Sequence, residues 1–246
     1  MTGWRTGWIL VKNDLLTWIN HKSSMGAEIA TLLVISLALA ERHADSRPLF
    51  VAVLGGPSVR VIQGRLIEGL NGWTWFMTCV LFAISVTGLF DTPPEWVRLT
   101  LIRTRSRSQW ALARLVALLA LALGFFAILM GFLAGAVVTG ITPGPFTTWT
   151  SLWDVALWAL GLLAMGWFEM ALTLLTRSVW WGLSATFLLL GLAAFGGQWA
   201  PFIPFAQWIV AMHNHPGTLS ITQGILYLSG WTVFWGGAVL GTAPRS

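Results

Sequence analysis

The sequence predicts an all-α polytopic membrane protein, built as a single domain over residues 1–246. Composition is the first reason, because 56% of the residues are hydrophobic and only 9% are charged, whereas a soluble domain carries roughly a quarter charged residues. Patterning is the second reason, because six apolar segments are close to or above the length of about 20 residues that a helix needs to cross a bilayer. The 17 Trp residues are the third, since indole rings favour the membrane–water boundary.

Six transmembrane helices are predicted from the apolar runs. They lie near Ser24–Ala40, Trp73–Phe90, Ala111–Thr139, Leu152–Thr176, Val179–Gln198 and Leu219–Gly241. The first is the shortest and contains Glu28, and the third is long enough to tilt in the bilayer.

The distribution of basic residues predicts the topology. With the N-terminus inside, ten basic residues fall on the cytoplasmic side: Arg5, Lys12, Lys22, Arg98, Arg103, Arg105, Arg107, Arg114, Arg177 and Arg245. Four fall outside: Arg42, Arg47, Arg60 and Arg65. Because cytoplasmic loops are enriched in Lys and Arg, we expect a multi-pass protein of the bacterial cytoplasmic membrane with both termini in the cytoplasm.

Residues 1–22 predict an amphipathic helix ahead of the first span. Apolar residues recur at spacings of four and three, at Trp4, Trp8, Val11, Leu15 and Trp18. The charged residues of this segment, Arg5, Lys12, Asp14 and Lys22, lie mostly on other faces of the helix. A basic helix with Trp on its apolar face is typical of the inner membrane surface, and the alternative is an amphipathic helix packed on protein.

Residues 199–217 begin with an apolar run that is too short to cross a bilayer. Pro201 and Pro204 interrupt its start. We therefore expect a re-entrant or surface-lying segment on the outer side.

Residues 91–110 join the second and third spans and predict a short cytoplasmic helix. Thr92 can cap it, Pro93 suits its first position and Glu95 can reach back to the cap. One face then carries three apolar residues, Trp96, Leu99 and Ile102. On this pattern alone, the alternative is an ordinary positive-inside loop that happens to be helical.

This segment resembles the cytoplasmic loop of ABC-2 type transporter permeases. The resemblance rests on residues 95–107, EWVRLTLIRTRSR, followed by QWALARL at 109–115. In that family an acidic residue opens a short helix, a Ser-Arg element follows, and a basic residue begins the next span. Glu95, Ser106-Arg107 and Arg114 match these positions.

The resemblance implies a six-span exporter permease that works as a homodimer or a pseudo-dimer with a separate cytoplasmic ABC ATPase subunit. The residues that would dock on the ATPase are Glu95, Trp96, Leu99, Ile102 and Arg103. The chain has no G-x-x-x-x-G-K-[ST] loop, so we expect no enzyme activity and no cofactor on this chain, with ATP and Mg bound by the partner. Membrane lipid is the other expected partner, and nucleic acid is not expected.

Cargo is predicted only as a class. This chain is similar in size and layout to two kinds of compact permease. One kind exports amphipathic cytolytic peptides, such as phenol-soluble modulins, and the other confers antimicrobial-peptide immunity. The alternatives are drugs, lipids or lipid-linked glycans as cargo, or a non-transporting membrane scaffold. The candidate residues of a substrate path are an intramembrane acid and four aromatic residues: Glu169, Trp73, Trp75, Phe76 and Trp167.

Other chemistry is weakly signalled. His213 and His215 lack nearby Cys or carboxylates, so we expect a solvated loop and no metal site. Gly182-Leu-Ser184 lacks the second glycine of a G-x-S-x-G element, and no His lies at membrane depth, so no catalytic residue is predicted. The single cysteine, Cys79, excludes a disulfide within the chain.

Overall fold

The computed structural model describes residues 2–20, 22–40, 53–54, 70–89, 107–141, 149–195, 203–207 and 219–242. These residues form helices and no strand, which confirms the predicted all-α class. The α-helices are α1 (Thr2–Asn20), α2 (Lys22–Ala40), α5 (Leu70–Thr87), α7 (Arg107–Val138), α8 (Trp149–Thr176), α9 (Val179–Phe195) and α10 (Ile221–Thr242). A 3-10 turn, η2, covers Pro204–Ala206.

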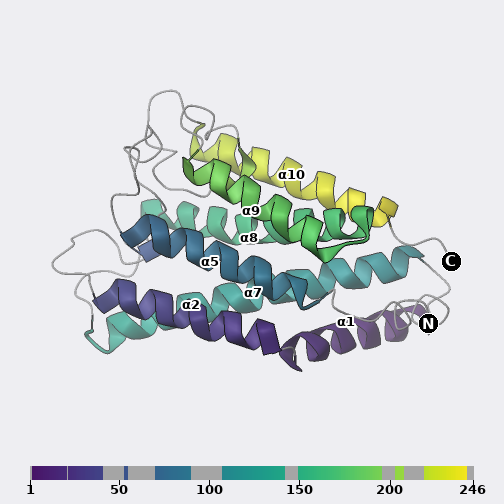
Figure 1. Ribbon diagram of the computed structural model, residues 1–246, viewed down its shortest axis with the longest axis horizontal. Coiled ribbons are helices and arrows are strands. Elements are labelled where there is room, and N and C mark those ends of the chain that lie inside the picture. Colours follow the sequence, from purple (N-terminus) through teal and green to yellow (C-terminus); the bar gives the residue numbers. More distant parts are fainter. Residues whose placement is uncertain are drawn as a thin grey trace.

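The helices from α2 to α10 form an antiparallel bundle. α1 and α2 run in the same direction, and from α2 onward successive helices alternate in direction, so the start of α1 and the end of α10 lie at the same end of the bundle (Figure 1). The start of α7 and the turn between α8 and α9 lie toward that same end (Figure 1). We call it the α1 end.

Three helices are long and apolar enough to cross a membrane. Their apolar stretches are Ser108–Val138, Leu152–Thr176 and Ile221–Thr242. The other three predicted spans correspond to shorter apolar helices, at Met25–Leu39, Trp73–Thr87 and Val179–Ala194. The apolar helices therefore match the predicted positions, and three of them reach spanning length in the part of the chain that the structure describes.

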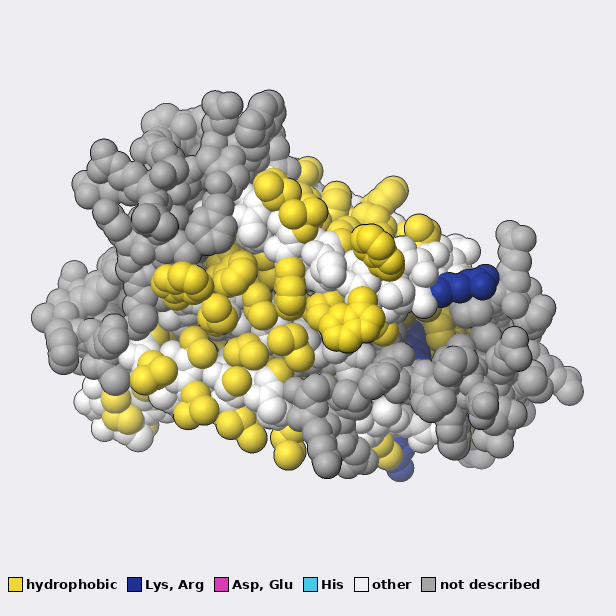
Figure 2. Space-filling model, in the orientation of Figure 1, with side chains coloured by type: hydrophobic (Ala, Val, Ile, Leu, Met, Phe, Trp, Pro, Cys, Tyr) yellow, Lys and Arg dark blue, Asp and Glu magenta, His cyan; other side chains and the backbone are white. Residues whose placement is uncertain are grey.

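The outside of the bundle is apolar, as expected for a protein that meets lipid. Ile29, Leu33 and Leu37 of α2 are exposed at four-residue intervals along one stripe. Trp180, at 76% exposure, and Leu188 extend the apolar surface over α9. Hydrophobic side chains cover the middle of the face in Figure 2, and the basic side chains visible among the coloured residues lie toward the α1 end.

Three glycines bring α8 into close contact with its neighbours. A Cβ atom at Gly236 of α10 would lie 2.7 Å from the ring of Trp167. A Cβ at Gly182 of α9 would lie 2.7 Å from the backbone oxygen of Glu169. Gly166 lies against Leu118 of α7. Because a helix with glycine at the contact allows its neighbour to approach closely, α8 is the central helix of the bundle.

The connection between α8 and α9 is only two residues long, Arg177 and Ser178. Arg177 has a φ of 55°, the left-handed conformation that commonly ends a helix and that usually falls to glycine. This turn folds α9 directly back onto α8.

The N-terminal helix α1 packs on protein. Val11 is buried against Ala113 and Ala117 in the first turns of α7. Trp8, Ile9 and Leu16 remain exposed on α1. The predicted apolar stripe is therefore divided, because Val11 meets α7 whereas Trp8 is exposed.

Candidate functional site

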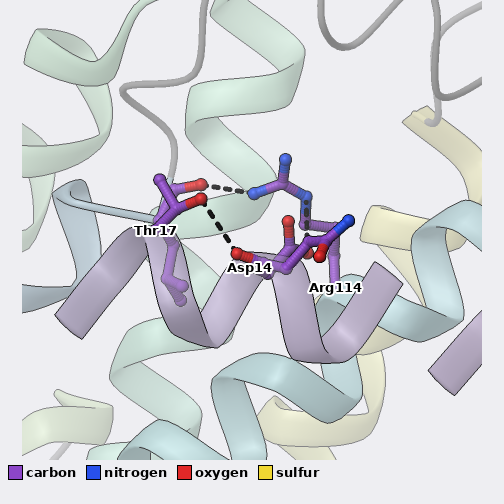
Figure 3. Close-up of polar contacts among 5 residues, drawn as sticks. Asp14, Thr17 and Arg114 are labelled. Atoms are coloured by element: carbon purple, nitrogen blue, oxygen red, sulfur yellow. Dashed lines mark hydrogen bonds and ion pairs between the residues drawn. The ribbon is translucent and has the colours of Figure 1, made fainter. Parts of the chain in front are cut away.

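The α1 end of the bundle holds a buried arginine that joins three helices. Arg114 projects from the second turn of α7, and its Nε lies 3.1 Å from the Oδ2 of Asp14 on α1. The same guanidinium donates from Nη1 to the backbone oxygen of Leu89, just beyond the end of α5. Its Cζ atom also lies 5.5 Å from the ring centroid of Trp110. Figure 3 shows Arg114 reaching toward the Asp14–Thr17 stretch of α1.

This ion pair is largely removed from solvent. The side chains of Arg114 and Asp14 are 7% and 14% exposed. Burial raises the pKa of the Asp14 carboxyl above its ordinary value, and the positive charge of Arg114 acts in the opposite direction. Removing one partner of a buried ion pair leaves the other charge uncompensated, which costs about 3–5 kcal/mol. The contact is therefore a strong determinant of where α1 docks.

A second polar feature lies inside the bundle, on α8. Glu169 is fully buried, and neither carboxyl oxygen has a hydrogen-bond partner among the described residues. Thr173 lies one turn further along α8, so both side chains project from similar faces of the helix. The Thr173 hydroxyl also lacks a described partner.

Other buried threonines behave differently from Thr173. Thr31, Thr78, Thr186 and Thr232 each donate to the backbone oxygen four residues earlier. That local bond is the usual way in which a helix satisfies a hydroxyl in an apolar environment. Glu169 and Thr173 are thus two buried polar side chains without a hydrogen-bond partner among the described residues, and Thr173 packs against Gly182 of α9.

An aromatic cluster covers the neighbouring face of α8. The ring of Phe168 lies 5.7 Å from Phe205 of η2, 5.9 Å from Trp231 and 4.9 Å from Trp235 of α10, as centroid distances. The indole nitrogens of Trp231 and Trp235 are buried without a described hydrogen-bond partner. Here η2 closes the bundle, with Pro204, Phe205 and Ala206 all buried.

The predicted substrate-path residues do not converge on one site. Trp73 is exposed and packs edge-on against Phe76 at 6.4 Å, whereas Trp75 is fully buried. These three residues begin α5, which starts at the end of the bundle opposite the α1 end (Figure 1). Trp167 and Glu169 lie on the half of α8 that approaches the α1 end. The predicted ATPase-coupling residues, Glu95, Trp96, Leu99, Ile102 and Arg103, lie outside the described residues.

Comparison with protein families identifies the kind of chain. The family model described as "Protein of unknown function (DUF2705)" matches residues 31–212, about three quarters of the chain. The chain belongs to the DUF2705 family. No curated protein and no solved structure matches this DUF2705 member. The matched region starts after α1 and includes Arg114, Glu169 and Thr173, and Asp14 lies before it.

Sequence reasoning missed the role of Asp14, which the amphipathic pattern assigned to a face away from the apolar stripe. The sequence of α7 in this DUF2705 member does indicate that Arg114 needs a partner of opposite charge. Arg114 is the only charged residue between Ser108 and Val138, and a buried charge in an apolar helix requires an opposite charge nearby. Among the described residues, no group of three or more His, Cys, Asp or Glu side chains is arranged to hold a metal.

Proposed function

We propose that this protein is the membrane-spanning permease subunit of an ATP-driven ABC exporter. In this proposal it crosses the bacterial cytoplasmic membrane six times, with both termini in the cytoplasm. Six apolar helices that alternate in direction support the topology, since the start of α1 and the end of α10 share one end of the bundle (Figure 1). Arg114 and Arg177 lie toward that end, as cytoplasmic residues should.

One contact carries the proposal. The segment that resembles a coupling helix lies between α5 and α7, and Arg114 bonds the Leu89 carbonyl at its beginning from a position just after its end. The same arginine holds α1 through Asp14. A force applied to this segment by an ATPase would therefore reach α1, α5 and α7 together. Arg114 is also the residue that matches the basic position of the ABC-2 type loop.

The coupling step is tested with the permease and its ATPase reconstituted together. The double substitution Trp96→Asp and Leu99→Asp should abolish transport and its link to ATP hydrolysis, because charge would replace the apolar docking face. Leu101→Asp is the matched control, since it places a carboxylate on another side of the predicted helix. Normal coupled turnover in the double variant would overturn the proposal.

The proposed cargo is an amphipathic or hydrophobic peptide. The supporting feature is the aromatic cluster of Phe168, Phe205, Trp231 and Trp235 inside the bundle, where two buried indole nitrogens lack a hydrogen-bond partner among the described residues. Amphipathic peptides should stimulate the ATPase of the reconstituted complex, and Phe168→Ala should reduce that stimulation. Stimulation by lipids or drugs, with none by peptides, would reject this cargo.

A further inference from the structure

Arg114 and Glu169 lie at the same level of the antiparallel pair α7 and α8. The contact between Leu118 and Gly166 sets the register of the two helices. Arg114 is four residues from this contact along α7, about 6 Å toward the α1 end, at 1.5 Å rise per residue. Glu169 is three residues from it along α8, about 4.5 Å in the same direction because the helices are antiparallel. Their axial positions therefore differ by only about 1.5 Å.

The two residues also turn to the same side of the α7–α8 contact. Stepping back four residues on α7 rotates the side-chain direction by about 40° from that of Leu118, and stepping forward three on α8 rotates it by about 60° from that of Gly166. In an antiparallel pair these two rotations lead to the same side. The side chain of Arg114 is long and flexible, and it is engaged here by Asp14 and the Leu89 carbonyl.

Among the described residues, Arg114 is the cation of the surrounding helices that lies level with Glu169, whereas Arg177, in the turn after α8, is eight residues further on, about 12 Å along the helix. The sequences of α5, α8, α9 and α10 contain no Lys, Arg or His, and their other titratable groups are Cys79, Asp154 and Tyr227. On α7 the basic residues are Arg107 and Arg114. On α1 and α2 the charged groups are Arg5, Lys12, Asp14, Lys22 and Glu28. The half-buried Glu28 also has an Oε1 without a described partner.

We propose that Glu169 is a proton-binding site and that Arg114 displaces its proton when α1 undocks. Two buried carboxylates, Asp14 and Glu169, share one arginine. In the arrangement described here Arg114 pairs with Asp14, and Glu169 is the neutral acid. When α1 leaves, Arg114 pairs with Glu169, the O–H bond breaks and the proton passes to water at the α1 end. Re-docking of α1 reverses each step.

The physical reason is the cost of a buried charge. An ionised carboxylate without a partner is strongly disfavoured in an apolar interior, so the group holds a proton or finds a cation. In this bundle the same cation also decides whether α1 docks. Proton occupancy and the position of α1 are therefore linked through one side chain, and each biases the other.

Infrared difference spectroscopy of the purified chain in lipid nanodiscs tests the inference without cargo or ATPase. A C=O stretch of a protonated carboxyl should be present in the wild type, absent in Glu169→Gln and retained in Glu28→Gln. In Asp14→Asn the band should disappear, because Arg114 is released toward Glu169. The double variant Asp14→Asn with Arg114→Gln should recover the band, since no cation remains to displace the proton.

Two further variants separate docking of α1 from the loss of a charge. Ala117→Trp on α7 should push Val11, and with it α1, away from α7 and remove the band with every charge still in place. Lys12→Asn removes an exposed charge of α1 and should leave the band unchanged. If the C=O band of the wild type is still present in Glu169→Gln, Glu169 is not the proton-binding site. A band that persists in both Asp14→Asn and Ala117→Trp, or that is not recovered in the double variant, overturns the displacement by Arg114. Failure of these tests would leave the permease proposal standing, because none of them measures transport.

Discussion

The contact between α8 and α10 offers a stringent test of the bundle, because two adjacent glycines of α10 differ in a single respect. A Cβ at Gly236 would lie 2.7 and 2.8 Å from two ring carbons of Trp167, whereas a Cβ at Gly237 would meet nothing within 4 Å. Ordinary van der Waals contact begins at 3.4 Å. Gly236→Ala therefore requires α10 and the indole to separate by roughly 0.6–0.7 Å, or the indole to leave its position, and overpacking of this kind costs about 1–3 kcal/mol.

The helix-propensity gain of about 0.5–1 kcal/mol from glycine to alanine is shared by both substitutions. The difference between the two variants therefore reports packing alone. We expect Gly237→Ala to be as stable as the wild type or more stable, and Gly236→Ala to be about 1–3 kcal/mol less stable than Gly237→Ala. Reversible unfolding in mixed micelles, followed by Trp fluorescence, measures this difference. Equal unfolding free energies for the two variants would show that Trp167 does not lie against Gly236.

Three further predictions concern other contacts. Gly182→Ala should destabilise the protein by about 2 kcal/mol, because the new methyl would meet the backbone of α8 at 2.7 Å. Gly191→Ala, on the open face of the same helix, should not destabilise the protein. Equal melting temperatures for the two variants would contradict the close approach of α8 and α9. Asp14→Asn should loosen the docking of α1 by about 3–5 kcal/mol, because it leaves the buried Arg114 without its counter-charge. Hydrogen exchange of α1 should then be faster than in the wild type, and unchanged exchange would argue against the ion pair. Trp158→Phe should cost about 1–3 kcal/mol, because its Nε1 donates to the Leu54 carbonyl at 2.9 Å, and an unchanged unfolding free energy would mean that this bond does not form.

The positions of the apolar helices were predictable from sequence because each depends on a run of side chains that only lipid or a helix core accommodates. The all-α class and the long helix α8 followed directly. The start of α7 did not. The apolar run begins at Ala111, whereas the helix begins at Arg107, because its first turn is polar and gives no apolar pattern. Polar residues at a helix start are tolerated when they lie beyond the apolar region.

The contacts between helices were not predictable from the pattern. Periodicity identifies the apolar face of α1, but it does not say whether lipid or α7 covers that face. Glu169 was recognised as a buried acid because any carboxylate in such a run is conspicuous. Its register with Arg114 depends on the packing of Leu118 against Gly166, which joins positions almost 50 residues apart. No local feature of the sequence predicts the contact between these two positions.

The two-residue turn at Arg177 constrains how the molecule can change shape. With so little chain between them, α8 and α9 cannot slide past each other by a helical turn or swing apart at this end, so they must travel as one rigid hairpin. Any rearrangement that opens a path through the protein has to take place along the seams that this hairpin shares with α5, α7 and α10.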